Sequence, residues 1–155
     1  MPVKDVKDTN NQLQRFVDAQ DRLQGGKYGD ATIFEVACLE MLQEQKRTHW
    51  MWFIFPQLRG LSPSTTGTHY GLRGIEETIA FMCHPVLQNR YRACVGIVNN
   101  PKTIESFSEI DKMKLRSSLS LFYVANGSPE NIYLDVLDCM GWDLCDKTLE
   151  LLGMI

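Results

Sequence analysis

The sequence predicts an all-α protein, a single compact domain of about seven short helices around an aromatic-rich core. Two observations support this: apolar residues recur at helical spacing along most of the chain, and no segment offers a clear strand partner. A chain of 155 residues, with 44% hydrophobic and 23% charged residues, is typical of one globular domain. We expect a flexible N-terminal arm at residues 1–10 and a single helical domain over residues 11–155.

The first helix is predicted from Leu13, and its apolar stripe includes a polar residue. Leu13, Phe16, Val17 and Gln20 follow the i, i+3, i+4, i+7 pattern of an amphipathic helix. Gln20 is therefore interpreted in two ways. It is either a buried amide whose hydrogen-bonding groups are satisfied within the protein, or an amide that contacts a ligand.

The second helix is predicted to begin at a capping box. Thr32 is followed three residues later by Glu35, the pattern in which each side chain bonds the other's backbone N–H. The helix runs towards Lys46. Its expected apolar face consists of Phe34, Ala37, Cys38, Met41 and Leu42.

The tryptophan block, residues 46–61 (KRTHWMWFIFPQLRGL), holds two of the three tryptophans of the chain. A buried aromatic side chain removes roughly 150–250 Å² from water, so this block should anchor the core. Its periodicity fits both a strand and a helix, and Pro56 must end or kink either one. We favour a short or irregular helix. The residues expected in the core are Met51, Phe53, Ile54, Phe55 and Leu58.

The polar residues of the tryptophan block are candidates for a site. Burying a polar group without a partner costs about 1–3 kcal/mol, so these side chains either find partners in the fold or face a cleft. His49 can act as an acid or base near neutral pH, and Arg47 can bind an anionic group bidentately. The alternative is a structural His49 bonded to a backbone carbonyl. Trp50 and Trp52 either stack a ligand ring or fill the core.

The second half of the chain adds further helices and one more candidate pair. One of these helices is predicted to start at His84-Pro85, with proline in its first turn. Residues 62–74 are expected to form a loop, and Glu76 and Glu77 to lie on a solvated helix face. Lys114 and Ser117 are three residues apart on one predicted helix, where they could bind phosphate or ribose oxygens. Ser117 could equally be a small residue that lets two helices pack closely.

Composition excludes several classes of function. The net charge is −3, which predicts no nucleic-acid partner, and no stretch approaches the ~18 apolar residues of a membrane span. Five cysteines without a C-x-x-C pair, after an N-terminus that lacks a signal peptide, indicate reduced thiols and a cytoplasmic protein. Three histidines without H-x-x-x-H spacing predict no metal site. We expect no cofactor, and a monomer.

Four blocks, in this order, resemble a known family: FVDAQD (16–21), KRTHWMWFIFPQLRGL (46–61), HPVL (84–87) and DKMKLRSSLSLF (111–122). It is a family of small, mainly bacterial, uncharacterised proteins that is grouped with a mainly α-helical mycobacterial protein. The resemblance spans roughly residues 12–152 and implies one mainly α-helical domain without an established activity. A weaker similarity, in the order of elements only, is to α-helical domains that act on ADP-ribose and related N-glycosides.

Two functions follow from these observations, and whether the protein is an enzyme is open. The first is a pocket beside the tryptophan block that binds a small nucleotide-like or phosphorylated ligand, with His49 as acid/base if an N-glycosidic bond is hydrolysed. The second is a non-catalytic protein-interaction or regulatory domain in which the tryptophan block is structural core. The predicted ligand-binding residues are Gln20, Arg47, Trp50, Trp52, Gln57, Lys114 and Ser117.

Overall fold

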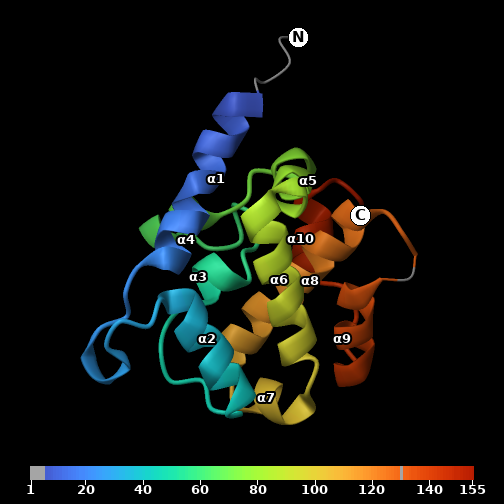
Figure 1. Cartoon of the computed structure of the whole chain (residues 1–155). Helices are drawn as coiled ribbons and strands as arrows, with labels where there is room; N and C mark the ends of the chain where they lie inside the picture. Colours follow the sequence, from blue (N-terminus) through green and yellow to red (C-terminus); the bar gives the residue numbers. More distant parts are fainter. Residues whose placement is uncertain (1–5, 130) are drawn as a thin grey trace.

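The computed structural model describes residues 6–129 and 131–155, with side chains from Gln12 onward, and this part of the chain is helical without a β-strand (Figure 1). The α-helices are α1 (Val6–Asp21), α2 (Ile33–Leu42), α3 (Met51–Ile54), α4 (Thr65–Tyr70), α5 (Ile75–Cys83), α6 (Pro85–Val98), α7 (Pro101–Glu105), α8 (Glu109–Asn126), α9 (Ile132–Met140) and α10 (Asp146–Leu151). A 3-10 helix, η1, spans Gly26–Tyr28. The all-α prediction is confirmed. Some of the helices beyond the expected seven are short ones, such as α4 in the predicted loop at 62–74.

Helix α1 begins earlier than the sequence suggested. Its first residue is Val6, so residues 6–10, expected in a flexible arm, are helical, while residues 1–5 of that arm lie outside the described residues. The predicted stripe faces the core: Leu13 and Phe16 are fully buried and Gln20 nearly so. The stripe therefore predicted which side of α1 packs inward.

The start of α2 is the predicted capping box, but its buried face is rotated from the expected one. The Thr32 hydroxyl accepts from the Glu35 N–H (3.1 Å), and a Glu35 carboxylate oxygen accepts from the Thr32 N–H (3.0 Å). Leu42, expected in the core, is 67% exposed. Apolar residues lie all round this helix, so periodicity could not select one side. The buried residues are Ile33, Val36, Ala37, Glu40 and Met41.

Helix α6 runs through the centre of the molecule, in contact with α2, α5 and α9 (Figure 1). Its start matches the predicted His84-Pro85 signal. Nδ1 of His84 accepts hydrogen bonds from the N–H groups of Val86 and Leu87, and Pro85 takes the first helical position. One side of α6 is buried along its whole length, so this helix presents side chains to several neighbours at once.

Helices α8 and α9 form the other half of the core. Helix α8 ends at Asn126, where Gly127 adopts a left-handed conformation (φ 78°) that a glycine tolerates best. Asn131 then caps α9 by accepting from the N–H groups of Tyr133 and Leu134. Helices α5, α6, α8 and α9 thereby surround a cluster of aromatic side chains.

Candidate functional site

The tryptophan block is an anchor of the core, as expected. Its residues Met51–Ile54 form the short helix α3, and the five residues predicted to be in the core are each at most 8% exposed. Trp50 is fully buried as well, and its ring lies 5.8 Å from the ring of Phe107, edge to face. In this arrangement the Trp50 indole packs against protein on all sides.

Glu40 holds the start of the tryptophan block in place. Its carboxylate is fully buried and accepts hydrogen bonds from Trp50 Nε1 (2.8 Å), from the backbone N–H groups of Arg47 and Thr48 (both 3.1 Å), and from the Tyr28 hydroxyl (2.9 Å). Burial raises the pKa of this carboxyl, but the hydrogen bonds together outweigh it and lower the pKa. The charge is thus satisfied by donors from three segments. Sequence reasoning missed Glu40, although it stands seven residues after Ile33 on the buried stripe.

Two lysines join the block to the first turns of α8. Lys46 forms an ion pair with Asp111 (Nζ–Oδ2 3.0 Å) while its Nζ lies 4.6 Å from the ring centre of Trp50. Lys114 lies over the half-buried Trp52, with Nζ 3.9 Å from the ring centre. Burial lowers the pKa of Lys114. Of the predicted site residues, Trp52 and Lys114 are brought together in this way.

The other predicted residues go to different places. Gln20 is a satisfied buried amide, since its Nε2 donates to the Phe53 carbonyl (2.8 Å) and its Oε1 accepts from Arg90 (3.2 Å). Gln57 and Ser117 are both 7% exposed, and the Ser117 hydroxyl donates to the Met113 carbonyl (2.9 Å). The polar groups of Gln20 and Ser117 are therefore already engaged within the fold.

Arg47 and His49 are exposed, on the connection that leads into α3. The Arg47 guanidinium donates to the side-chain oxygen of Gln45 on the same connection. Neither side chain lines the cavity between α5, α6, α8 and α9. The structure thus distributes the predicted residues among the core, the surface and the Trp52–Lys114 pair.

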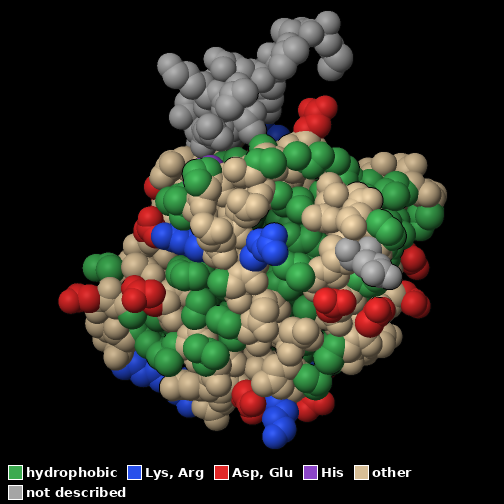
Figure 2. All heavy atoms as spheres, turned by 45° about the vertical axis from the view of Figure 1, so that its right-hand side comes forward, with side chains coloured by type: hydrophobic (Ala, Val, Ile, Leu, Met, Phe, Trp, Pro, Cys, Tyr) green, Lys and Arg blue, Asp and Glu red, His purple; other side chains and the backbone are tan. Residues whose placement is uncertain are grey.

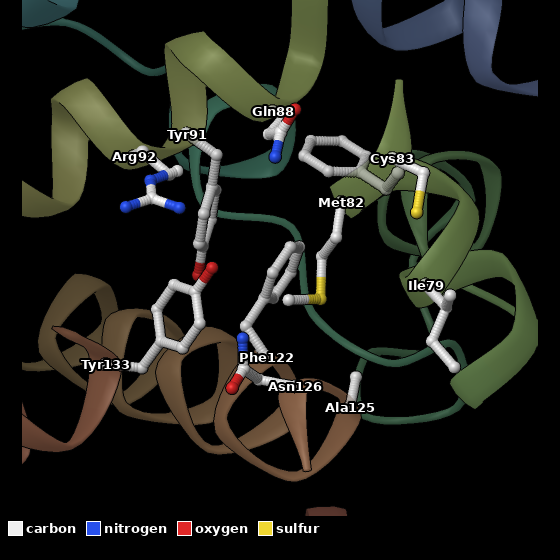
Figure 3. A pocket seen from close by; sticks show the side chains of 11 residues that line it. Ile79, Met82, Cys83, Gln88, Tyr91, Arg92, Phe122, Ala125, Asn126 and Tyr133 are labelled. Carbon is white, nitrogen blue, oxygen red and sulfur yellow. The ribbon is translucent and has the colours of Figure 1, made fainter. Parts of the chain in front are cut away.

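A cavity of about 270 Å³ opens between α5, α6, α8 and α9 (Figure 3). Tyr91 and Phe122 form its floor as a parallel stack, with ring centres 3.9 Å apart and an angle of 17° between the rings. Phe81 stands edge-on to both, and Tyr133 closes one side. The lining residues are Ile79, Phe81, Met82, Cys83, Gln88, Tyr91, Arg92, Phe122, Ala125, Asn126 and Tyr133.

Polar side chains edge this aromatic floor. Gln88 and Arg92 come from α6 and Asn126 from the end of α8, and all three are exposed (Figure 3). No carboxylate partner of Arg92 is found among the described residues. Burial raises the pKa of Tyr133, and the positive charge of Arg92 opposes that rise. The phenol is therefore a neutral donor beside a guanidinium that has no carboxylate partner among the described residues.

Sequence reasoning did not find this cavity. Its walls are mostly apolar residues, and their spacing predicts that they are buried. Spacing does not predict whether the neighbouring helices pack closely enough to leave no cavity. Arg92 carried the one usable signal, a cation beside the buried Tyr91 without an acidic residue three or four positions away on the same helix.

Comparison with known proteins gives a family and a fold but no activity. The protein is similar to a crystal structure of the conserved hypothetical protein Rv1873 from Mycobacterium tuberculosis, with 33% identity, a TM-score of 0.80, and 93% of this chain and 98% of that chain covered. No curated protein matches. Within the described residues, no helix is long and apolar enough to cross a membrane, and no three potential metal ligands gather. A family model matches residues 10–152, and the chain therefore belongs to the family described as "Protein of unknown function (DUF1810)".

Proposed function

We propose that this protein binds a small, flat, anionic molecule in the cavity between α5, α6, α8 and α9. The observation that carries the proposal is the combination of an aromatic floor with a guanidinium that lacks a carboxylate partner among the described residues. Ligand sites are typically concave and apolar, with a few polar groups that fix orientation. The sequence predicted a small nucleotide-like or phosphorylated ligand beside the tryptophan block. We keep a small anionic ligand and assign it to this cavity instead.

The size and walls of the cavity favour a ligand of one or two rings. A dry cavity of about 150 Å³ holds a benzene molecule, so 270 Å³ suits a ring with substituents. The faces of Tyr91 and Phe122 are stacked on each other, and Tyr91 and Tyr133 keep only 3% and 4% of their surface exposed, so a ligand would meet ring edges in edge-to-face contacts. The thioether of Met82 is polarisable and flexible, and it can adapt to ligands of somewhat different shape.

Arg92 supplies the preference for negative charge. A guanidinium presents parallel N–H donors that match a carboxylate or a phosphate, and such charged hydrogen bonds contribute about 1.5–3 kcal/mol each. The amides of Gln88 and Asn126 lie at the same opening, where they can bond other polar groups of the ligand. His49 does not line the cavity. We therefore assign ligand binding to the cavity and propose no reaction there.

We also propose that the protein is a monomer, that it acts in the cytoplasm, and that it has no nucleic-acid partner. On the face shown in Figure 2, Lys and Arg side chains stand apart from one another among hydrophobic and acidic ones. Nucleic-acid binding needs a basic stripe or patch instead. Five cysteines, all unpaired, favour a reducing compartment.

The experiment that tests the proposal is a methyl NMR titration of the full chain with benzoate, salicylate and AMP, each paired with its neutral counterpart, benzamide, salicylamide or adenosine. We expect saturable shifts at the methyl groups of Ile79, Met82 and Ala125 with at least one anion. The Arg92→Gln variant should weaken that binding about tenfold or more. The matched control is Arg22→Gln, an exposed cation outside the cavity that should leave the affinity unchanged.

Three results would overturn the proposal. Shifts confined to Met51, Ile54 and Met113 would return the site to the tryptophan block. Unchanged affinity in Arg92→Gln would remove the anion-binding role. No saturable shift with any probe would favour the second candidate, a non-catalytic interaction or regulatory domain. That candidate is supported by the complete burial of Trp50 in the core.

A further inference from the structure

Two of the five cysteines lie against each other between α2 and α6. The Sγ atoms of Cys38 and Cys94 are 4.0 Å apart, although 56 residues separate them in sequence. Cys94 is 1% exposed, whereas Cys38 is half-buried, so solvent can reach one thiol of the pair and not the other. The remaining cysteines, Cys83, Cys139 and Cys145, have no such thiol neighbour.

The packing of the two helices keeps these thiols in register. One turn before the cysteines, the Arg90 guanidinium of α6 lies over the Phe34 ring of α2, 5.1 Å from its centre. Arg90 and Cys94 are four residues apart, as are Phe34 and Cys38, so the two helices run parallel and meet along one line (Figure 1). Arg90 is held in turn by an ion pair with Asp21 (2.8 Å). The thiol contact is thus part of a fixed helix interface.

The two thiols are chemically unequal. The hydrogen bond with Cys94 is the largest influence on Cys38 and lowers its pKa, against burial and the nearby Glu35 carboxylate. The same hydrogen bond and burial raise the pKa of Cys94 well above the usual range, while the Arg90 charge opposes the rise. The accessible Cys38 is therefore the thiol that ionises first, and Cys94 keeps its proton.

We propose that Cys38 and Cys94 form a peroxide-sensitive dithiol, in which Cys38 reacts first and Cys94 resolves the product as a disulfide. The Cys38 thiolate attacks one oxygen of a hydroperoxide, the O–O bond breaks, and Cys38 becomes a sulfenic acid. The leaving alkoxide or hydroxide takes up a proton from water, equivalent to the one that Cys38 released on ionising, and departs as an alcohol or water. The Cys94 sulfur then attacks the Cys38 sulfur. The S–O bond breaks, and the hydroxyl leaves as water with the Cys94 proton.

The second step requires the two sulfur atoms, which are already in contact, to move closer together. A disulfide needs about 2.05 Å between the sulfur atoms, so the pair must approach by roughly half its present separation. A thiol without a partner would instead stay at the sulfenic acid or oxidise further.

The test is treatment of the full, reduced chain with limiting hydrogen peroxide, followed by alkylation and peptide mapping without reductant. We expect a Cys38–Cys94 linked peptide that has lost two hydrogen atoms, formed before the exposed Cys83 and Cys139 are oxidised. In Cys94→Ala, Cys38 should accumulate as a sulfenic acid that dimedone traps. The matched control, Cys139→Ser, should form the linked peptide as the unmodified chain does.

Either of two outcomes would overturn the proposal. In the first, Cys83 or Cys139 is consumed while Cys38 and Cys94 remain reduced in the unmodified chain. In the second, Cys38 is oxidised to the sulfenic acid but no Cys38–Cys94 link forms. The mapping of the unmodified chain decides both, so the result does not depend on the folding of any variant.

Discussion

The indole N–H of Trp50 donates to a carboxylate oxygen of Glu40 over 2.8 Å, and both side chains are completely buried. The pair joins α2 to the tryptophan block. An indole needs a partner for its single donor when it leaves water, and a buried carboxylate needs several donors. Each therefore meets a requirement of the other.

Glu40→Gln should destabilise the protein, because the amide keeps the size of the side chain but replaces one acceptor oxygen with a donor group. The three N–H donors all point at Oε1 and can keep an amide oxygen there, but the Tyr28 hydroxyl, which donates to Oε2, then faces an amide N–H₂ and loses its acceptor. The negative charge that strengthens each bond of the set is lost as well. We expect the free energy of unfolding to fall by about 1–3 kcal/mol. Urea denaturation followed by circular dichroism measures this. The control is the exposed Glu105→Gln, which should change stability by less than about 0.5 kcal/mol.

Acid should remove the advantage of the unmodified protein over Glu40→Gln. The folded-state pKa of Glu40 lies below its ordinary value of 4.5, so the folded protein binds this proton more weakly than the unfolded chain does. The stabilisation is fully present above that ordinary value and is lost as the pH falls through the lower, folded-state value. Urea midpoints measured from neutral to acidic pH should converge for the two proteins. A difference that stays constant would show that the charge of Glu40 is not what stabilises.

The parts of the fold that sequence predicted are those specified by short-range rules. The capping box at Thr32 and the His84-Pro85 start depend on residues within one turn, where the chemistry is local. The buried members of the tryptophan block follow from their hydrophobicity alone. Such features need no knowledge of the rest of the chain.

The parts that sequence missed depend on contacts between distant segments. The face of α2 is decided by Glu40, whose donors come from both sides of that helix in sequence. The cavity depends on how closely four helices approach, which composition does not specify. Glu77 was expected on a solvated face, and that prediction is wrong because Arg15, 62 residues earlier, meets it at 2.9 Å.

The ion pair between Arg15 and Glu77 should stabilise the fold because both side chains are largely buried. The Arg15 and Glu77 side chains are 12% and 6% exposed, and Arg15 also donates to the carbonyls of His69 and Gly71. Glu77→Gln should lower the free energy of unfolding by about 2 kcal/mol, less than the ~3–5 kcal/mol of a fully enclosed pair because Arg15 keeps its carbonyl acceptors.

The matched control for Glu77→Gln is the same substitution at a glutamate whose ion pair lies at the surface. Glu109 pairs with Lys112 at 3.1 Å, and its side chain is 88% exposed. Glu109→Gln should alter stability by less than about 0.5 kcal/mol, because water and side-chain entropy cancel most of the attraction. Equal losses in Glu77→Gln and Glu109→Gln, measured by urea denaturation, would contradict the role given to burial.

A His49 variant distinguishes the two candidate binding sites, the cavity and the tryptophan block. The side chain is exposed and does not line the cavity, so His49→Ala should keep the unfolding free energy within about 0.5 kcal/mol. It should also leave the affinity for an anionic probe unchanged, whereas Arg92→Gln weakens it. The two affinities are measured by calorimetric titration with the same probe, and the unfolding free energy by urea denaturation. A tenfold loss in His49→Ala with no loss in Arg92→Gln would place the ligand at the block, because only a side chain close to the ligand can contribute that much to binding.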